Sequence, residues 1–413
     1  MDAVFDAHYR IIQDSFAQAG VWLDVAYTPN GDVDYIYEQG RLLVAEPDAN
    51  LRPLTEILRG ARVIEQTAGM AIVSIDDLQD GYLSVPDALA LVDSHFHTNI
   101  PPGGTPGVSP NHLFHVERLC SAIEPEVPSG HPRPWPPPRE PATDERPVRI
   151  GLVDTGLIKP LDPMLTWLSG VDGETDPLGP VLPGDLRLIP PFAGHGTFVA
   201  GVARCMAPQS EIFVGNELDT SGAQLESKIV QKIEQLIADF HPAIINVSSG
   251  AYTRNDWAPI AFEGFAERHP DLTVVAAAGN DSLDRPLFPA ALEYVISVGA
   301  LGPDQMHTAW FSNYGRWVDV YALGEGVINA FTVGQYRYHE PPKQPARQNF
   351  LNPIALWAGT SFSAPMVTGM IASRMGRSGE SSKEAAQALL SEAERNSIDG
   401  VGPALLITPP THA

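Results

Sequence analysis

The chain has 413 residues, 44% of them hydrophobic, and a formal net charge of −24. This length allows two or three domains, and the acidic balance argues against nucleic acid as a partner. The two cysteines, Cys120 and Cys205, provide no disulfide framework and favour a reducing compartment. The first residues lack a basic segment followed by an apolar core, and no run approaches about 18 apolar residues. We therefore expect a cytoplasmic protein with no membrane partner.

Residues 1–120 predict a small α+β domain. A helical apolar stripe covers residues 3–19, and a hairpin built on a Pro-Asn-Gly-Asp turn follows at residues 21–37. From residue 41 to residue 116 the patterns alternate in the order βαββαβ, which is a ferredoxin-like order. The residues alone fit an accessory α+β domain equally well.

Residues 121–147 are rich in proline, with glycine and charged residues interspersed. Such a composition cannot build a core and predicts an extended, semi-rigid linker.

Residues 148–413 predict a second domain, in which buried strands alternate with helices. Short apolar runs bounded by turn residues are typical of parallel strands covered on both faces, and they lie at residues 212–214, 243–247, 272–277 and 295–298. A capping-box pattern at residues 221–224 predicts the start of an amphipathic helix. We expect an α/β doubly wound domain that binds ligands at the carboxyl ends of its strands.

Four polar side chains stand at positions that suit acyl-transfer chemistry. Asp154 ends one buried strand and Asn280 ends another, while His195 begins a helix of small residues. Ser361 follows Gly359 and precedes an apolar helix, so it lies near unpaired N–H groups at the positive end of a helix dipole. A serine hydroxyl becomes a nucleophile only when a neighbouring base, here the imidazole, removes its proton.

In these motifs and their order the chain resembles the subtilisin-like serine proteases, or subtilases. The resemblance implies that Asp154 orients His195, that His195 activates Ser361, and that Asn280 donates to the oxyanion. Residues 1–120 weakly resemble the propeptide domain of that family. This implies that residues 1–120 act as a chaperone, as an inhibitor or as a recruitment module that binds a regulatory partner. Release of this domain near residues 120–124 fits the spacing, as does a permanent tether.

The resemblance also implies a peptide-binding cleft that holds substrate by strand addition, with protein or peptide substrates. Its walls and edges would include Leu218, Gly222, Ser248, Ser249, Gly250, Ala277, Ala278, Gly279 and Asp281. A carboxylate at Asp281 would favour a basic side chain before the scissile bond, or at least disfavour an acidic one.

The chain departs from the family pattern at two places. Phe198 stands where the family usually has a histidine, and the helix after His195 lacks the loop that holds a tight calcium ion in many subtilases. We expect no metal there and no cofactor. A histidine group at residues 95–115 does not have the spacing of a zinc site and is interpreted as solvated surface.

The leading hypothesis is an intracellular serine endopeptidase regulated by residues 1–120. The same triad also fits an esterase or acyl transferase, which would cleave esters without cleaving peptides. A third interpretation is a binding protein on an inactive protease scaffold, which the intact set of four polar residues argues against.

Overall fold

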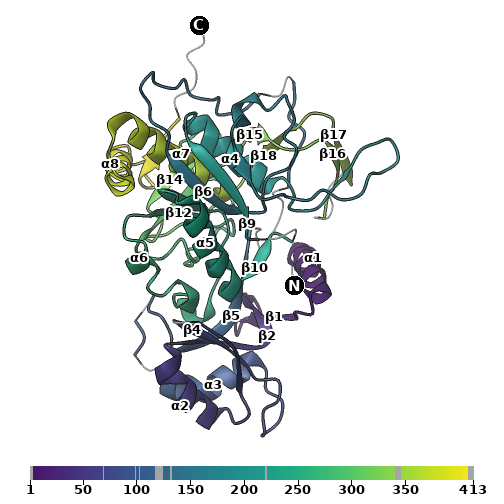
Figure 1. The fold of residues 1–413 in the computed structure, drawn as a ribbon, viewed down its shortest axis with the longest axis vertical. Coiled ribbons are helices and arrows are strands. Elements are labelled where there is room, and N and C mark those ends of the chain that lie inside the picture. Colours follow the sequence, from purple (N-terminus) through teal and green to yellow (C-terminus); the bar gives the residue numbers. More distant parts are fainter. Residues whose placement is uncertain are drawn as a thin grey trace.

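The computed structural model describes residues 3–67, 69–97, 99–101, 103–116, 124–130, 133–218, 221–339 and 346–407 (Figure 1). Its helices are α1 (Ala3–Gln18), α2 (Pro47–Ile57), α3 (Val85–Phe96), α4 (His195–Met206), α5 (Glu226–Phe240), α6 (Phe265–Arg268), α7 (Thr360–Ser378) and α8 (Ser382–Arg395). Its strands are β1 (Leu23–Tyr27), β2 (Val33–Ala45), β3 (Arg62–Gln66), β4 (Met70–Ser74), β5 (Val108–His115), β6 (Arg149–Asp154), β7 (Asp172–Gly173), β8 (Leu188–Ile189), β9 (Glu211–Asn216), β10 (Ala223–Leu225), β11 (Ile244–Val247), β12 (Thr273–Ala277), β13 (Val295–Leu301), β14 (Val320–Leu323), β15 (Val327–Ala330), β16 (Gly334–Arg337), β17 (Arg347–Phe350), β18 (Ile354–Trp357) and β19 (Ala404–Leu405).

The N-terminal unit is an antiparallel sheet in the order β10-β5-β2-β4-β3, with β1 paired to β2. Helices α2 and α3 cover one face of this sheet, where Leu54 and Leu89 are fully buried. The elements from β2 to β5 follow the βαββαβ order expected from the sequence. The strands expected on either side of Gly40 form the single strand β2, because Gly40 adopts a φ of 66° and lets the strand continue.

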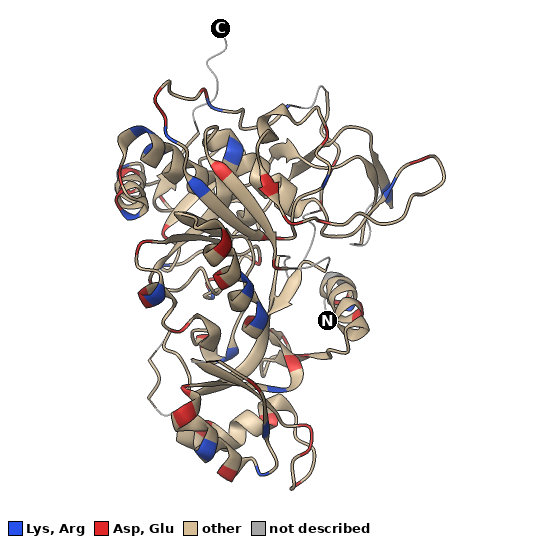
Figure 2. Ribbon diagram, viewed as in Figure 1, with Lys and Arg blue, Asp and Glu red and all other residues tan. Residues whose placement is uncertain are grey.

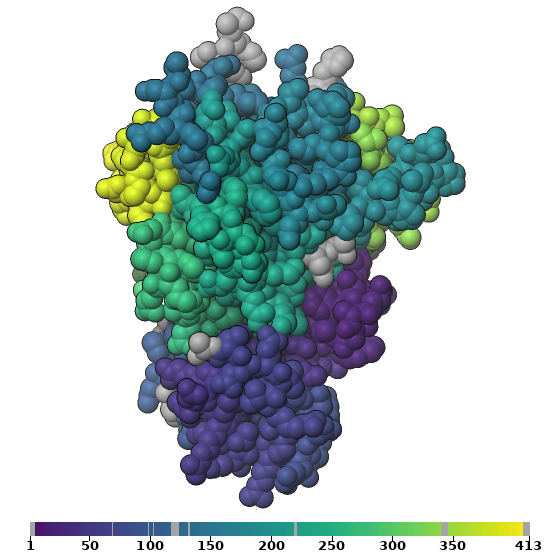
Figure 3. Space-filling view, viewed as in Figure 1, coloured from purple at the N-terminus to yellow at the C-terminus, as the bar shows by residue number. Residues whose placement is uncertain are grey.

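The N-terminal sheet rests on helix α5 of the larger unit (Figures 2 and 3). Lys228 of α5 donates to a carboxylate oxygen of Glu65 at 2.7 Å. Asn111 of β5 donates to the hydroxyl of Ser227 at 3.1 Å, and its own oxygen accepts the Ser227 N–H at 3.1 Å. Helix α5 carries both blue and red positions in Figure 2, and the Lys228–Glu65 ion pair adds charge to the contact between the two units.

The described part of the proline-rich segment lies against the larger unit. Glu126 and Leu356 exchange two backbone hydrogen bonds of 2.8 Å, and Trp135 pairs with Ile328 in the same way at 2.7 and 3.0 Å. The segment is therefore extended, and it adds backbone pairs to both strands of the β15–β18 ribbon.

The larger unit is built on an eight-stranded sheet in the order β19-β14-β13-β12-β11-β6-β9-β7, and each of these pairs is parallel. Both faces are covered, since Leu152 and Val153 of β6 belong to different buried clusters. Strand order reverses at β6, which has β11 on one side and β9 on the other. The carboxyl ends of the central strands therefore meet at a crevice where α/β proteins bind ligands.

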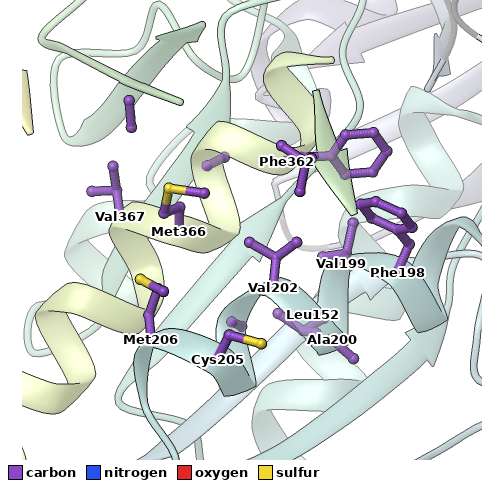
Figure 4. Close-up of a cluster of buried hydrophobic side chains, with 14 of the residues drawn as sticks. Leu152, Phe198, Val199, Ala200, Val202, Cys205, Met206, Phe362, Met366 and Val367 are labelled. Carbon is purple, nitrogen blue, oxygen red and sulfur yellow. The ribbon is translucent and has the colours of Figure 1, made fainter. Parts of the chain in front are cut away.

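Helices α4, α7 and α8 pack on one face of this sheet, and α5 and α6 pack on the other. In Figure 4, Val202 and Met206 of α4 point toward Met366 and Val367 of α7. A Cβ at Gly369 would lie 2.6 Å from a backbone oxygen of α4, so glycine allows this close approach. The contact fixes the N-termini of α4 and α7 relative to each other.

The capping box predicted at residues 221–224 is wrong. Residues 223–225 form β10, which pairs with β5, and α5 begins only at Glu226 with no side-chain cap. The Gln224 side chain instead donates to the backbone oxygen of Glu217 at 3.1 Å. Pairing with a neighbouring strand has overridden the local capping pattern.

A hairpin of β16 and β17 extends from the larger unit beside β8 (Figure 1). Among the described residues, no helix has the length and hydropathy that a membrane span requires.

Candidate active site

Asp154 and His195 form a buried pair at the carboxyl end of β6. Asp154 is the last residue of β6 and is fully buried, and its Oδ1 lies 2.7 Å from Nδ1 of His195. Oδ1 also accepts the N–H of Thr155 at 2.8 Å. Because Nδ1 of the imidazole is held by the carboxylate, Nε2 is the ring nitrogen that remains to take up a proton.

Ser361 is the second residue of α7, so the helix begins one residue before it rather than after it as the sequence predicts. It follows Gly359, whose φ of 155° favours glycine, and it is 4% exposed. The next residue, Phe362, places its ring centroid 5.5 Å from that of His195 and 4.3 Å from that of Phe198. Phe198 therefore packs beneath the site, and aromatic contact brings the helix of Ser361 against the imidazole.

The hydroxyl of Ser361 donates to the backbone oxygen of Ser248 at 3.3 Å. Ser248 returns a hydrogen bond of 3.0 Å from its own hydroxyl to the Ser361 carbonyl. Catalytic hydrogen bonds are often long before substrate binds. The Ser361 side chain would therefore have to rotate from Ser248 toward His195 for catalysis.

Asn280 is oriented by the residue that precedes Ser361. Its Oδ1 accepts from the backbone N–H of Thr360 at 2.8 Å and from the Thr360 hydroxyl at 2.9 Å. An ideal Cβ placed on Gly359 would lie 3.7 Å from both Nδ2 of Asn280 and the backbone nitrogen of Ser361. Two N–H donors therefore lie around one point beside Ser361, an arrangement suited to a developing oxyanion.

Most of the predicted substrate-binding residues line one pocket together with Ser361 and Thr360. These residues are Ser248, Ser249, Gly250, Ala277, Gly279 and Asp281. Asp281 accepts a hydrogen bond of 2.8 Å from the hydroxyl of Tyr252. The pocket is thus built from two walls with a carboxylate among its lining groups.

Two predicted residues lie behind the cleft surface. Ala278 is fully buried, and its carbonyl accepts from Asn313 at 2.9 Å. Leu218 is also fully buried and donates its N–H to the backbone oxygen of Asp154 at 3.1 Å. The edge available for strand pairing therefore runs through Gly222 and β10.

The end of β5 occupies the cleft. His115 and Gly250 exchange two backbone hydrogen bonds of 3.0 Å, and the N–H of Val116 donates to the oxygen of Gly222 at 3.0 Å. Both His115 and Val116 line the pocket of Ser361. Residues 120–123 of the expected release point lie outside the described residues.

Sequence reasoning missed three polar residues around the site. Asp176 accepts from the loops of Asp154 and His195, and Glu217 accepts the backbone N–H of Asp154 at 3.2 Å. Both lie outside any motif, and only the fold brings them to the pair. Thr360 orients Asn280 and stands next to Ser361. Of the three residues, it is the one that the sequence could have identified, because a hydroxyl beside the nucleophile is visible in the motif.

Of the histidines interpreted as solvated surface, His95 is exposed, whereas His112 is buried and His97 and His115 are partly buried. His112 is 2% exposed and lies 2.6 Å from a carboxylate oxygen of Glu226, while His97 lies 2.6 Å from Asp93. Each therefore binds a different carboxylate where the two units meet.

The chain shows clear similarity to known proteins. The Subtilase family matches residues 148–403. The Thermophilic serine proteinase of Bacillus sp. (strain AK1) is 32% identical over 270 residues, which cover 61% of this chain and 57% of that protein. Halolysin of Haloferax mediterranei is 30% identical over 54% of this chain and 40% of its own length. The Extracellular serine proteinase of Thermus sp. (strain Rt41A) is 31% identical over 43% of this chain and 40% of that protein.

Among solved structures, fervidolysin from Fervidobacterium pennivorans matches with a TM-score of 0.56 at 17% identity. The match covers 90% of this chain and 60% of that chain, and it speaks for the fold alone. The present chain spans about half the length of the curated relatives it matches. Since the family match covers more than half of the sequence and includes the Asp154, His195, Asn280 and Ser361 segments, this chain belongs to the subtilase family.

Proposed function

We propose that this chain is a serine endopeptidase. The observation that carries the proposal is the 2.7 Å contact between Asp154 and His195 beside the Ser361 helix. Ser361 Oγ attacks the scissile carbonyl carbon while Nε2 of His195 takes the hydroxyl proton and later gives it to the leaving amine. Asp154 holds the imidazole in the required tautomer and stabilises its charged form.

The tetrahedral intermediate carries a negative charge on the former carbonyl oxygen. Nδ2 of Asn280 and the backbone N–H of Ser361 would donate to that oxygen, since both surround the same point near Gly359. Loss of one such donor typically costs about 10²–10³ in kcat. The Thr360 contacts support this assignment. They hold Oδ1 of Asn280, which fixes the orientation of the amide and leaves Nδ2 as the atom that would donate to the oxyanion.

We propose that substrates are protein or peptide chains bound as an added strand. Gly250 offers backbone groups on one side of the cleft, and Gly222 with β10 offers them on the other. Backbone pairing of this kind binds many sequences, while side-chain pockets select among them. The chain's own residues 113–116 already lie between these two edges in that manner.

Residues 1–120 would act as a tethered inhibitor. A substrate cannot pair with Gly250 while His115 does, and the covalent link gives the N-terminal strand an effective concentration of about mM. Arg254 of the larger unit binds both oxygens of Asp93 at 2.8 and 2.9 Å, and Arg285 binds Asp34 at 2.8 Å. These ion pairs lie beside the cleft and would hold the inhibitor in register.

We propose an intracellular location on the basis of the cysteine content. Burial raises the pKa of the Cys205 thiol to about 12, which keeps it protonated and unreactive. One relative is named an extracellular proteinase, so the location calls for a direct test. Immunodetection in the cell lysate supports the proposal, and accumulation in the growth medium would overturn it.

The proposed chemistry is tested by covalent labelling. A fluorophosphonate reacts with an activated serine, so intact mass should rise by one adduct in the wild type, with the adduct on Ser361 in a peptide map. Ser361→Ala should remain unlabelled. An unlabelled wild type, or an adduct elsewhere in both proteins, would contradict the assignment.

A further inference from the structure

Asp176 is a buried carboxylate that lies beside the Asp154–His195 pair. Its Oδ2 accepts the backbone N–H of Gly194 at 2.7 Å and the hydroxyl of Thr155 at 3.0 Å. The side chain is 2% exposed, and its Oδ1 is buried with no hydrogen-bond partner among the described residues. Such a group costs free energy, so its presence in a folded protein calls for an explanation.

The two donors to Asp176 belong to the two segments that carry the pair. Thr155 directly follows Asp154, and Gly194 directly precedes His195. Gly194 is the N-cap of α4 at a φ of 89° and offers no side chain of its own, so Asp176, from a separate loop, accepts the N–H at the start of this helix. The hydroxyl of Thr155 also accepts the N–H of Gly196 at 3.1 Å, so the residue after Asp154 is bonded directly to the residue after His195.

This link matters because the Asp154–His195 contact joins two separate elements. The 2.7 Å distance depends on the end of β6 and the start of α4 keeping their relative position. A displacement of about 1 Å in a catalytic geometry can cost about 10²-fold in rate. Asp176 contacts both sides of that joint, yet it touches neither the imidazole nor the Ser361 helix in the contacts of the structure.

We propose that Asp176 is a positioning residue that fixes His195 against Asp154. This proposal rests on the proposed peptidase function. Asp176 acts through Thr155 and Gly194, and its role requires an acceptor oxygen at that place.

The charge state of Asp176 indicates which substitution is conservative. Burial, reinforced by the neighbouring charge of Asp154, raises the pKa of Asp176 to about 8. At neutral pH the side chain of Asp176 is therefore mostly a neutral acid. Asparagine reproduces a neutral acid in size and keeps one acceptor oxygen, whereas alanine removes the acceptor.

The test compares Asp176→Ala and Asp176→Asn in the full chain. Peptide turnover is measured once it has become constant, and kcat is expressed per site titrated to completion with a fluorophosphonate. We expect Asp176→Ala to lower kcat about 10- to 100-fold with KM changed less than about twofold. Asp176→Asn should stay within about threefold of the wild type. Asp172→Ala is the matched control, because Asp172 is an exposed aspartate on β7 nearby and should leave kcat unchanged.

Unchanged kcat per titrated site in Asp176→Ala would overturn the proposal, as would an equal loss in the alanine and asparagine variants. If Asp176→Ala does not fold, Thr155→Val breaks the same link from the other side. We expect it to lower kcat about 3- to 10-fold while Thr155→Ser does not, and unchanged kcat in Thr155→Val overturns the proposal. Failure of the peptidase function itself shows separately, as a wild type that neither turns over peptide nor takes up the label.

Discussion

His115 and Gly250 exchange two backbone hydrogen bonds of 3.0 Å, and this pairing joins the last strand of the N-terminal unit to a wall of the candidate active site. The chain thus presents its own strand in the place where an extended substrate would bind. On the proposed inhibitory role of residues 1–120, weakening this pairing should open the cleft to peptide substrates.

Replacement of Val116 by proline should weaken the hold of the N-terminal strand. The change removes the N–H that donates to Gly222, and one such hydrogen bond contributes about 0.5–1.5 kcal/mol. We expect the initial rate of peptide hydrolysis by the full chain to rise about 3- to 10-fold. Val116→Ala keeps the N–H and is the control. Equal rates in the two variants would show that this hydrogen bond does not hold the N-terminal strand in the cleft.

Substitution of Thr360 by valine should impair the oxyanion site without affecting peptide binding. The variant loses the hydroxyl that donates to Asn280 and accepts the N–H of Gly279 at 3.1 Å. We expect kcat to fall about 10-fold while KM changes little, because Asn280 acts only once the oxyanion forms. Thr360→Ser retains the hydroxyl and should remain near the wild type. A higher KM with kcat unchanged would show that Thr360 acts on substrate binding and not on the oxyanion site.

Asp281→Asn should change the preference for the residue before the scissile bond. Asp281 lines the pocket of Ser361, and a carboxylate there favours basic side chains and disfavours acidic ones. A peptide library should show a lower ratio of Lys or Arg to Glu cleavage in the variant. Tyr252→Phe removes the hydrogen bond to Asp281 but keeps the charge, so it should retain that ratio. An identical profile for Asp281→Asn and wild type would exclude the idea.

Glu217 should make the fold less stable as pH rises. Burial raises its pKa from 4.5 to about 8, so folding favours the protonated form. Its contribution to the free energy of unfolding is fully present below about pH 4.5 and is lost as pH rises toward 8. Glu217→Gln removes this titration, so its Tm should fall less than that of the wild type between pH 5 and pH 8. Parallel Tm curves for the two proteins would contradict the assignment.

The sequence alone predicted the parts of the site that local patterns encode. Asp154 and Asn280 end apolar runs, and His195 and Ser361 begin helices, so each residue and its element can be identified from a short stretch. The α/β class and the βαββαβ order followed from the same apolar periodicity. These features depend on neighbours in the sequence.

The remaining parts depend on contacts between distant segments. Asp176 lies in a loop with no motif, and only the packing of β6 against α4 gives it a role. The predicted cap at residues 221–224 failed because β5 pairs with that segment. Likewise, composition identified the proline-rich segment as extended, while its backbone pairs with Leu356 and Ile328 could be seen only in the fold.

The triad assignment is tested most directly by following the wild type and Ser361→Ala side by side, by intact mass and by hydrolysis of a fluorogenic peptide. The wild type should hydrolyse the peptide, and any shortened form of the chain should begin near residues 120–124. Ser361→Ala should stay at full length and hydrolyse nothing, and the double variant with His195→Ala should be no worse, because triad members act as a unit. Peptide hydrolysis by Ser361→Ala at the wild-type rate would contradict the account.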